Sequence, residues 1–191
     1  MTHDEATALY THTPRPVAAP VSFSLEPGRL VVDSGRKVTQ VRLDAVEEAR
    51  LSYEPGRIGH RQFRTRLRLT DGRSVTYTSL TWKSMIEARQ QAREYRDFTA
   101  ALLAEIARRS PSARFVAGRS APYWLMTGFV TLGLVAGLVW VLWRSLDKAA
   151  WSLGAFAAAM TLVGIWQLEP MLRLNKPRRF DPSHPPAELM P

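Results

Sequence analysis

The sequence predicts an α+β protein, in which a small antiparallel β sandwich or partly open barrel is capped by one long helix and followed by two transmembrane helices. Residues 21–82 alternate apolar and polar side chains in short runs separated by turn signals. Residues 84–109 repeat apolar side chains at helical spacing instead. Two uncharged apolar stretches then follow, at 122–143 and 149–168.

The chain has 191 residues, a formal net charge of +9 and no cysteine. A basic chain indicates nucleic acid or an anionic membrane surface as a neighbour. The lack of cysteine excludes disulfides and thiolate metal sites, and it fits a reducing compartment. Residues 1–20 lack the basic start and the apolar stretch of a signal peptide, and their prolines predict a flexible N-terminal arm.

About six runs in the first part of the chain have strand character. They are rich in β-branched and aromatic residues, and several end at Pro-Gly, Ser-Gly or Asp-Gly turn signals. This number of strands is enough for a small antiparallel sandwich or a partly open barrel. The expected strands are 21–25, 29–33, 37–43, 48–53, 61–70 and 74–80.

The register of the last β-hairpin follows from its side-chain pattern. Apolar and threonine side chains occupy the odd positions from Phe63 to Leu69, and arginines the even positions from Arg64 to Arg68. A two-residue turn would place arginines opposite apolar residues of the returning strand. A three-residue loop at 70–72 pairs Leu67 with Val75 instead and places a glycine at the left-handed position. We therefore expect the three-residue loop, with the arginines facing outward.

A long helix is expected from Ser84, because Ser84 and Glu87 have the spacing of a capping box. An apolar stripe runs from Met85 to Ile106, and the helix is expected to end near Arg109. Residues 110–121 are then expected to be a linker.

The strands followed by one terminal helix resemble the bacterial pleckstrin-homology-like domains found beside membrane spans. The resemblance covers residues 21–109 and rests on the helix from Ser84 and on the stretches RLVVDSGRKVTQVRLDAVEEARLSYEP and RTRLRLTDGRSVTYTS. It implies a cytoplasmic domain built as a bent antiparallel sandwich capped by a helix. It implies no single function, because this fold hosts lipid, peptide and protein binding.

The stretch 122–143, as a helix, is about 33 Å long, enough to cross a bilayer core of roughly 30 Å. The second expected span is 149–170, after a short external loop at 144–148. Two buried helices of a soluble bundle are the alternative, but such helices show a polar stripe. Aromatic side chains gather at the ends of both stretches, as they do at membrane interfaces: Tyr123, Trp124, Trp140, Trp143, Trp151 and Trp166.

Basic residues flank the two spans on the side of the termini. Positive charge stays inside, so both termini are expected in the cytoplasm. The resemblance to bacterial domains implies that the membrane is the bacterial inner membrane. The residues after the second span, 171–191, form a basic, proline-rich tail that is either disordered or a docking peptide. The juxtamembrane basic residues expected to contact lipid headgroups are Lys176, Arg178 and Arg179.

Small residues at intervals of four predict close helix packing within the membrane. They are Gly133 and Gly137 in the first span, and Gly154 and Ala158 in the second. We expect the two spans to pack on each other along these residues. A homodimer seam is the alternative.

The arginine cluster around the fifth expected strand, 61–70, is the candidate site. The functional interpretation is attraction to anionic lipid headgroups or to an acidic partner, and the alternative is a solvated sheet face. The candidate residues are Arg57, Arg61, Arg64, Arg66 and Arg68.

The sequence predicts no catalytic residues, no metal site and no cofactor. The four histidines lack metal-ligand spacing, and no glycine-rich phosphate loop is present. Nucleic acid is disfavoured because no groove-reading helix is apparent. We therefore expect a non-catalytic adaptor or accessory subunit, with an unknown membrane-protein partner or a second copy of the chain. The alternative function is sensing of anionic lipid or the membrane surface by the arginines.

Overall fold

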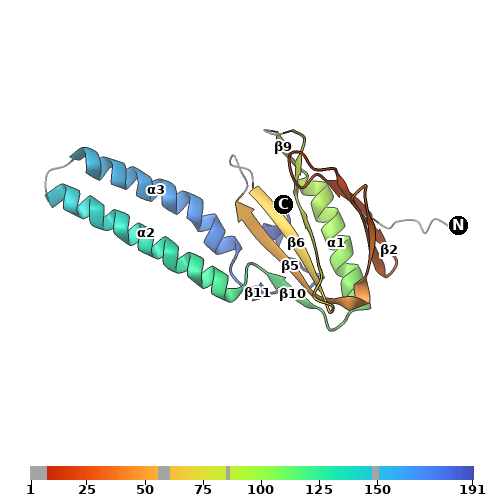
Figure 1. Cartoon of the computed structure of the whole chain (residues 1–191). Coiled ribbons are helices and arrows are strands. Elements are labelled where there is room, and N and C mark those ends of the chain that lie inside the picture. Colours follow the sequence, from red (N-terminus) through yellow and green to blue (C-terminus); the bar gives the residue numbers. More distant parts are fainter. Residues whose placement is uncertain (1–7, 56–60, 85–86, 148–150) are drawn as a thin grey trace. The chain divides into compact units, whose positions relative to one another are not determined.

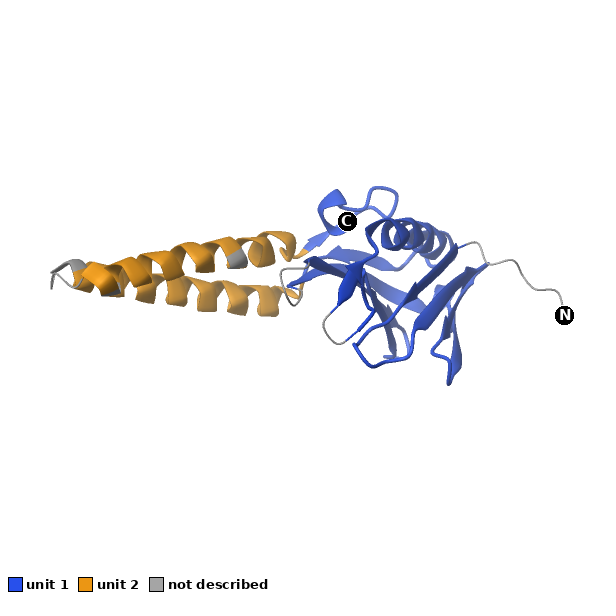
Figure 2. Ribbon diagram, turned by 90° about the horizontal axis from the view of Figure 1, so that it is seen from above, with its two compact units in different colours: residues 1–118, 178–191 blue, residues 119–177 orange. Residues whose placement is uncertain are grey.

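The structure is a computed structural model that describes residues 8–55, 61–84, 87–147 and 151–191. It divides into two compact units, shown in separate colours in Figure 2. The first comprises residues Met1–Gly118 and Arg178–Pro191, and the second residues Arg119–Pro177. The chain therefore leaves the first unit, forms the second and returns to the first.

The first unit begins with a four-stranded antiparallel sheet in which each strand pairs with the next along the chain. One side chain in two along these strands is buried, as with Phe23 and Leu25, which explains the alternation in the sequence. The sheet comprises β1 (Ala8–His12), β2 (Val21–Glu26), β3 (Arg29–Asp33) and β4 (Val38–Arg42).

A short 3-10 turn, Leu43–Ala45, leads into a second sheet of five strands. Its order is β11-β10-β5-β6-β7, and β10 runs parallel to β5 while the other pairs are antiparallel. The strands are β5 (Val46–Pro55), β6 (Arg61–Leu69), β7 (Ser74–Thr78), β10 (Arg114–Ala117) and β11 (Arg178–Arg179). A separate two-stranded ribbon consists of β8 (Leu80–Trp82) and β9 (Ala88–Gln90).

The predicted three-residue loop between β6 and β7 is confirmed. Leu67 lies opposite Val75 in the register of the two strands. The backbone N–H of Gly72 donates to the carbonyl of Leu69 at 3.0 Å. Gly72 has a φ of +82°, a left-handed conformation that residues with a Cβ rarely adopt. Turn geometry and side-chain parity therefore select the same register.

Helix α1 (Ala92–Arg109) lies beside the strands of the first unit (Figure 1). It packs against both sheets through a cluster of aromatic rings. The buried hydroxyls of this cluster find partners inside the core. Tyr10 donates to the Thr78 carbonyl at 2.6 Å, and the hydroxyls of Tyr95 and Thr65 lie 2.7 Å apart. The cluster contains Tyr10, Phe23, Tyr77, Tyr95 and Phe98.

The N-terminal arm predicted at 1–20 is not entirely flexible, because its residues 8–12 form β1. Tyr10 of β1 lies opposite Phe23 of β2 and is buried in the aromatic cluster. Burying this ring compensates for ordering the short strand. Residues 1–7 lie outside the described residues.

The prediction that α1 begins at Ser84 is wrong, since the helix begins at Ala92. The N–H of Glu87 does donate to the Ser84 hydroxyl at 3.1 Å, but this contact closes the turn between β8 and β9. A serine followed three residues later by glutamate satisfies turn N–H groups as well as helix N-terminal ones. Met85 lies outside the described residues.

The linker predicted at 110–121 contains β10. Of the tail predicted at 171–191, residues 171–174 belong to α3 and residues 178–191 to the first unit. β10 pairs with β5, because an unpaired strand edge presents donors and acceptors that need partners. β11 then pairs with β10. Beyond β11 the ring of Phe180 contacts that of Phe115, with their centroids 6.0 Å apart, and Leu189 is buried.

The second unit is a pair of packed helices, α2 (Ala121–Asp147) and α3 (Trp151–Leu174). Both are long and apolar enough to cross a membrane, and apolar side chains such as Phe129 and Trp166 are exposed along them. The helices extend beyond the predicted spans 122–143 and 149–170. Residues 144–147 of the predicted external loop are helical, while 148–150 lie outside the described residues.

The imidazole of His12 lies in the aromatic core, where its side chain stacks with the rings of Tyr10 and Phe23 at centroid distances of 5.7 and 5.5 Å. His12 is 3% exposed, and its Nδ1 has no hydrogen-bond partner among the described residues. Burial lowers the pKa of His12 to about 4 from the ordinary value of 6.5.

We predict that the first unit loses stability as the pH falls from about 6.5 to about 4. The unfolded chain binds a proton at His12 in this window and the folded chain does not, so the proton favours unfolding. The expected loss is about 2 kcal/mol by pH 4.5. It is measured by urea unfolding of the full chain in detergent, followed by near-ultraviolet circular dichroism of the tyrosines.

The matched variant is His12→Phe, which keeps a ring between the two aromatic neighbours and removes the titration. Its pH dependence should be smaller than that of the natural chain by the same amount. An identical pH dependence in both proteins would contradict the assignment to His12.

Candidate functional site

The outer face of the five-stranded sheet, opposite α1, is rich in arginine. In the register of β5 and β6, Arg50 lies opposite Arg66, and their neighbours along each strand, such as Leu51 and Leu67, point inward and are buried. The same parity places Arg114 of β10 and Arg179 of β11 on this face. We call this set of six residues the arginine face: Arg50, Arg64, Arg66, Arg68, Arg114 and Arg179.

Glutamates neutralise much of the arginine face. Glu47 accepts from both Arg68 and Arg114, at 3.0 and 2.8 Å. Arg64 pairs with Glu54 at 2.6 Å. Arg50 pairs with Glu48 at 3.0 Å. The face is therefore a network of ion pairs with an excess of positive charge, and not a uniform field of free cations.

Arg66 differs from its neighbours, since it makes no ion pair with any described residue. Among the described residues, its one polar side-chain contact is a 3.5 Å hydrogen bond to the Ser74 hydroxyl, which is long and weak. It also lies opposite Arg50, a residue of the same charge. Arg66 is exposed, so its guanidinium remains available to an anionic partner.

The predicted site is only partly brought together. Arg64, Arg66 and Arg68 share the outer face, as expected. Arg61 has the parity of buried Phe63 and so belongs to the other side of β6, where the strand end leaves it exposed. Arg57 lies outside the described residues.

Sequence reasoning missed Arg50 and Arg114, and it assigned Arg179 to the basic residues after the second span and not to this sheet face. Arg50 was detectable in principle, because Glu48, Arg50 and Ser52 alternate with apolar residues along β5. The other two belong to strands of four and two residues, which give too short an alternation to recognise.

The glycines of the first span do not pack on the second helix. A Cβ added at Gly133 or Gly137 would meet no described atom within 4 Å beyond its own helix. Gly154 instead lies at the α2–α3 contact, where a Cβ would be 3.4 Å from the Cβ of Ser145. Ala157 is buried beside it, while Ala158 is half-buried. The prediction that the two helices pack on each other along Gly133 and Gly137 is therefore wrong. The predicted packing at Gly154 is confirmed.

The juxtamembrane basic residues differ in their surroundings. Lys176 is exposed at the end of the second unit. Arg178 and Arg179 form β11, and Arg178 is ion-paired with Glu188. Their expected contact with lipid headgroups stays a prediction.

The described residues contain no group of three or more histidine, cysteine, aspartate or glutamate side chains placed to hold a metal ion. A polar depression of about 490 Å³ is lined by Pro27, Glu105, Arg108 and Arg109. It lies between the β2–β3 turn and the last turns of α1.

Comparison of the chain with protein-family models, with curated proteins and with solved structures found no match. The description of its strands and helices therefore rests on its own structure and not on that of a relative. The resemblance to pleckstrin-homology-like domains stays a prediction.

We predict unequal stability effects at two arginines of β6. Replacing Arg64 with Gln should lower the free energy of unfolding by about 1 kcal/mol, because the ion pair between Arg64 and half-buried Glu54 is lost. Replacing Arg66 with Gln should change it by less than about 0.5 kcal/mol, because no ion pair is lost and a like-charge contact disappears. Both variants are tested by the urea unfolding midpoint of the full chain. An equal loss of stability in the two variants would contradict the ion pairing described for Arg64.

We predict that Gly154→Leu separates the two helices and that Gly137→Leu does not. The leucine at 154 would collide with Ser145 and Leu142, whereas position 137 is open. Cysteines introduced at Gly128 and Leu172, which approach each other, report the packing by cross-linking with a short thiol reagent. The chain has no other cysteine to interfere. A loss of cross-linking in the Gly137→Leu variant alone would contradict the packing.

Proposed function

We propose that this chain is a non-catalytic integral membrane protein of the bacterial inner membrane, which acts as an adaptor or accessory subunit. Its first unit serves as a pleckstrin-homology-like binding domain in the cytoplasm, and α2 and α3 anchor it. The four-stranded antiparallel sheet, the second sheet and the capping helix support the pleckstrin-homology-like assignment. The apolar, exposed surfaces of α2 and α3 support membrane insertion.

The pairing of β10 with β11 is the observation that carries this proposal. These strands directly precede and follow the helical pair, and they belong to the same sheet as β5. Only residues 118–120 separate β10 from α2, and residues 175–177 separate α3 from β11. The domain is thus joined to its membrane anchor by two short connections instead of one flexible linker. A partner bound to this sheet would be held at the membrane surface.

Basic residues at the connected end of the helices support the cytoplasmic placement. Arg119, Arg173 and Lys176 flank α2 and α3 on the side of the domain, and positive charge favours the cytoplasmic side. Both termini of the chain are then cytoplasmic as well.

Sensing of anionic lipid by the arginine face is the second candidate function. The excess of arginine over glutamate and the unpaired guanidinium of Arg66 favour it. Each unneutralised basic residue near an anionic surface contributes about 1 kcal/mol. The ion pairs reduce the number of such residues, which is why the adaptor function ranks first.

The adaptor function is tested by a photo-crosslinking amino acid at Thr76, which is exposed on β7 opposite Arg66. We predict a discrete protein adduct in intact cells that disappears in an Arg66→Glu variant, because the reversed charge repels an acidic partner. Arg93→Glu, on the exposed surface of α1, is the matched control and should leave the adduct unchanged. A chain that yields no discrete adduct at Thr76 contradicts the proposal.

The lipid function is tested with a Thr76→Cys variant in nanodiscs. Anionic lipid should slow maleimide labelling of this cysteine several-fold at low salt and not at high salt, since salt screens the attraction. Replacing Arg64, Arg66 and Arg68 together with Gln should abolish the protection. An unchanged labelling rate in zwitterionic and anionic nanodiscs would eliminate this function, and Arg93→Cys reports general changes in reactivity.

A further inference from the structure

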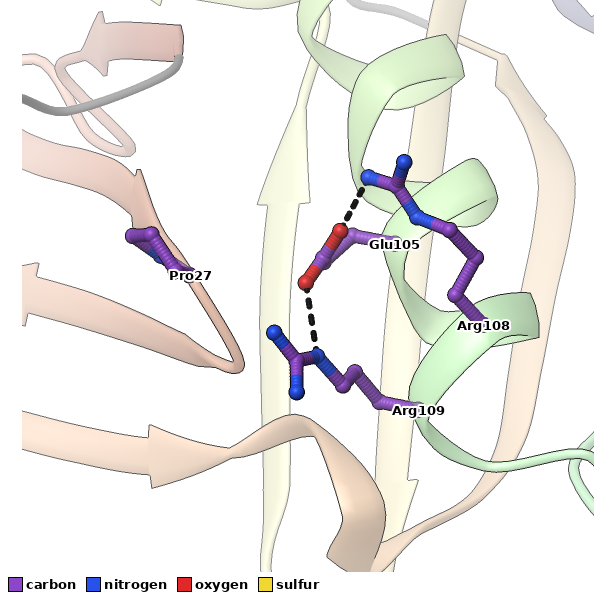
Figure 3. A pocket seen from close by; sticks show the side chains of 4 residues that line it. All are labelled: Pro27, Glu105, Arg108 and Arg109. Carbon is purple, nitrogen blue, oxygen red and sulfur yellow. Dashed lines mark hydrogen bonds and ion pairs between the residues drawn. The ribbon is translucent and has the colours of Figure 1, made fainter.

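A second basic site lies away from the arginine face, in the depression between the β2–β3 turn and the end of α1 (Figure 3). Pro27 forms one wall, and Arg108 and Arg109 lie across from it with Glu105 between them. The volume of about 490 Å³ is within the range of small-molecule sites. Three of the four lining residues are charged, so the depression suits a small polar ligand and not an apolar one.

Glu105 holds the two arginines in place. One of its carboxylate oxygens accepts from the Nε of Arg109 at 3.0 Å and from the backbone N–H of Gly28 at 3.2 Å, and the other oxygen accepts from Arg108. The hydrogen bond from Arg109, and then that from Arg108, lowers the pKa of Glu105 below its ordinary value. The carboxylate therefore stays ionised at neutral pH and orients both guanidinium groups.

The arginines retain binding capacity after pairing with Glu105. Each guanidinium has five N–H donors, and the described interactions use one of Arg108 and one of Arg109. The side chains of Arg108 and Arg109 are 72% and 51% exposed, so the remaining donors reach solvent. Two cations against one carboxylate leave a net positive charge in the depression.

Gly28 keeps this space open. It has a φ of +77°, and a Cβ there would lie 3.6 Å from the guanidinium carbon of Arg109. A longer side chain would extend into the space beside the guanidinium. The turn therefore needs glycine for its backbone conformation, and the same glycine leaves Arg109 accessible.

We propose that this depression binds a phosphoryl group through Arg108 and Arg109. Planar guanidinium groups bind phosphate oxygens through paired hydrogen bonds, and the net positive charge of the depression attracts the phosphate anion. The chemistry is the same for free phosphate and for the headgroup of a phosphatidic acid. The proposal does not depend on the adaptor function or on the arginine face.

Phosphorus NMR tests the site, with inorganic phosphate titrated into the full chain in a phosphorus-free detergent. The expected result is saturable binding that weakens roughly tenfold in Arg108→Gln or Arg109→Gln, the effect of one charged hydrogen-bonding group. Arg93→Gln on the same helix, whose side chain is 91% exposed, should bind as the natural chain does. Arg108 and Arg109 are exposed, so their substitution should leave the fold intact. Circular dichroism of every variant checks this.

A second arm uses nanodiscs with and without phosphatidic acid and follows amide hydrogen exchange at the β2–β3 turn. Slower exchange that requires phosphatidic acid and both arginines identifies a lipid headgroup as the source. Phosphate binding in detergent without any such slowing in nanodiscs identifies a free phosphate. Three outcomes would overturn the proposal: no binding in either arm, binding unchanged by both pocket substitutions, or binding removed by substituting Arg64, Arg66 and Arg68 instead.

Discussion

The backbone edge of β5 determines how the chain is organised. An edge strand presents N–H and C=O groups that need partners, and β10 supplies them in parallel register from Arg114 to Ala117. The pairing fixes the segment that follows α1 and extends the sheet toward β11. It also explains why the chain before α2 and after α3 is ordered. Without β10, neither connection to the helical pair would belong to the domain.

The parts of the fold that could be predicted from the sequence are those set by local patterns. The β6–β7 hairpin was predictable to the residue, because side-chain parity and a glycine in the loop constrain the same register. The two apolar helices were predictable from their length and lack of charge. β1, β10 and β11 were not, since strands of two to five residues form through distant partners and carry little pattern of their own.

In the candidate site too, local patterns predict some features, while others depend on residues distant in the sequence. The outward direction of Arg64, Arg66 and Arg68 follows from alternation along one strand. The neutralisation of Arg68 does not, because it depends on an irregularity of β5 between Val46 and Glu48. The extra residue there, Glu47, reaches both Arg68 and Arg114. Helix packing was similarly beyond the sequence, since a small-residue spacing does not specify which face of a helix meets its neighbour.

The position of β11 has a consequence for the order of assembly. Ribosomes make the chain from its N-terminus, so the residues of β11 appear only after α2 and α3 have been synthesised. The five-stranded sheet is therefore completed last, by a strand encoded beyond the apolar helices. Folding of the domain and placement of the helices become successive stages of a single process, in which the final strand closes the sheet once the helical pair has formed.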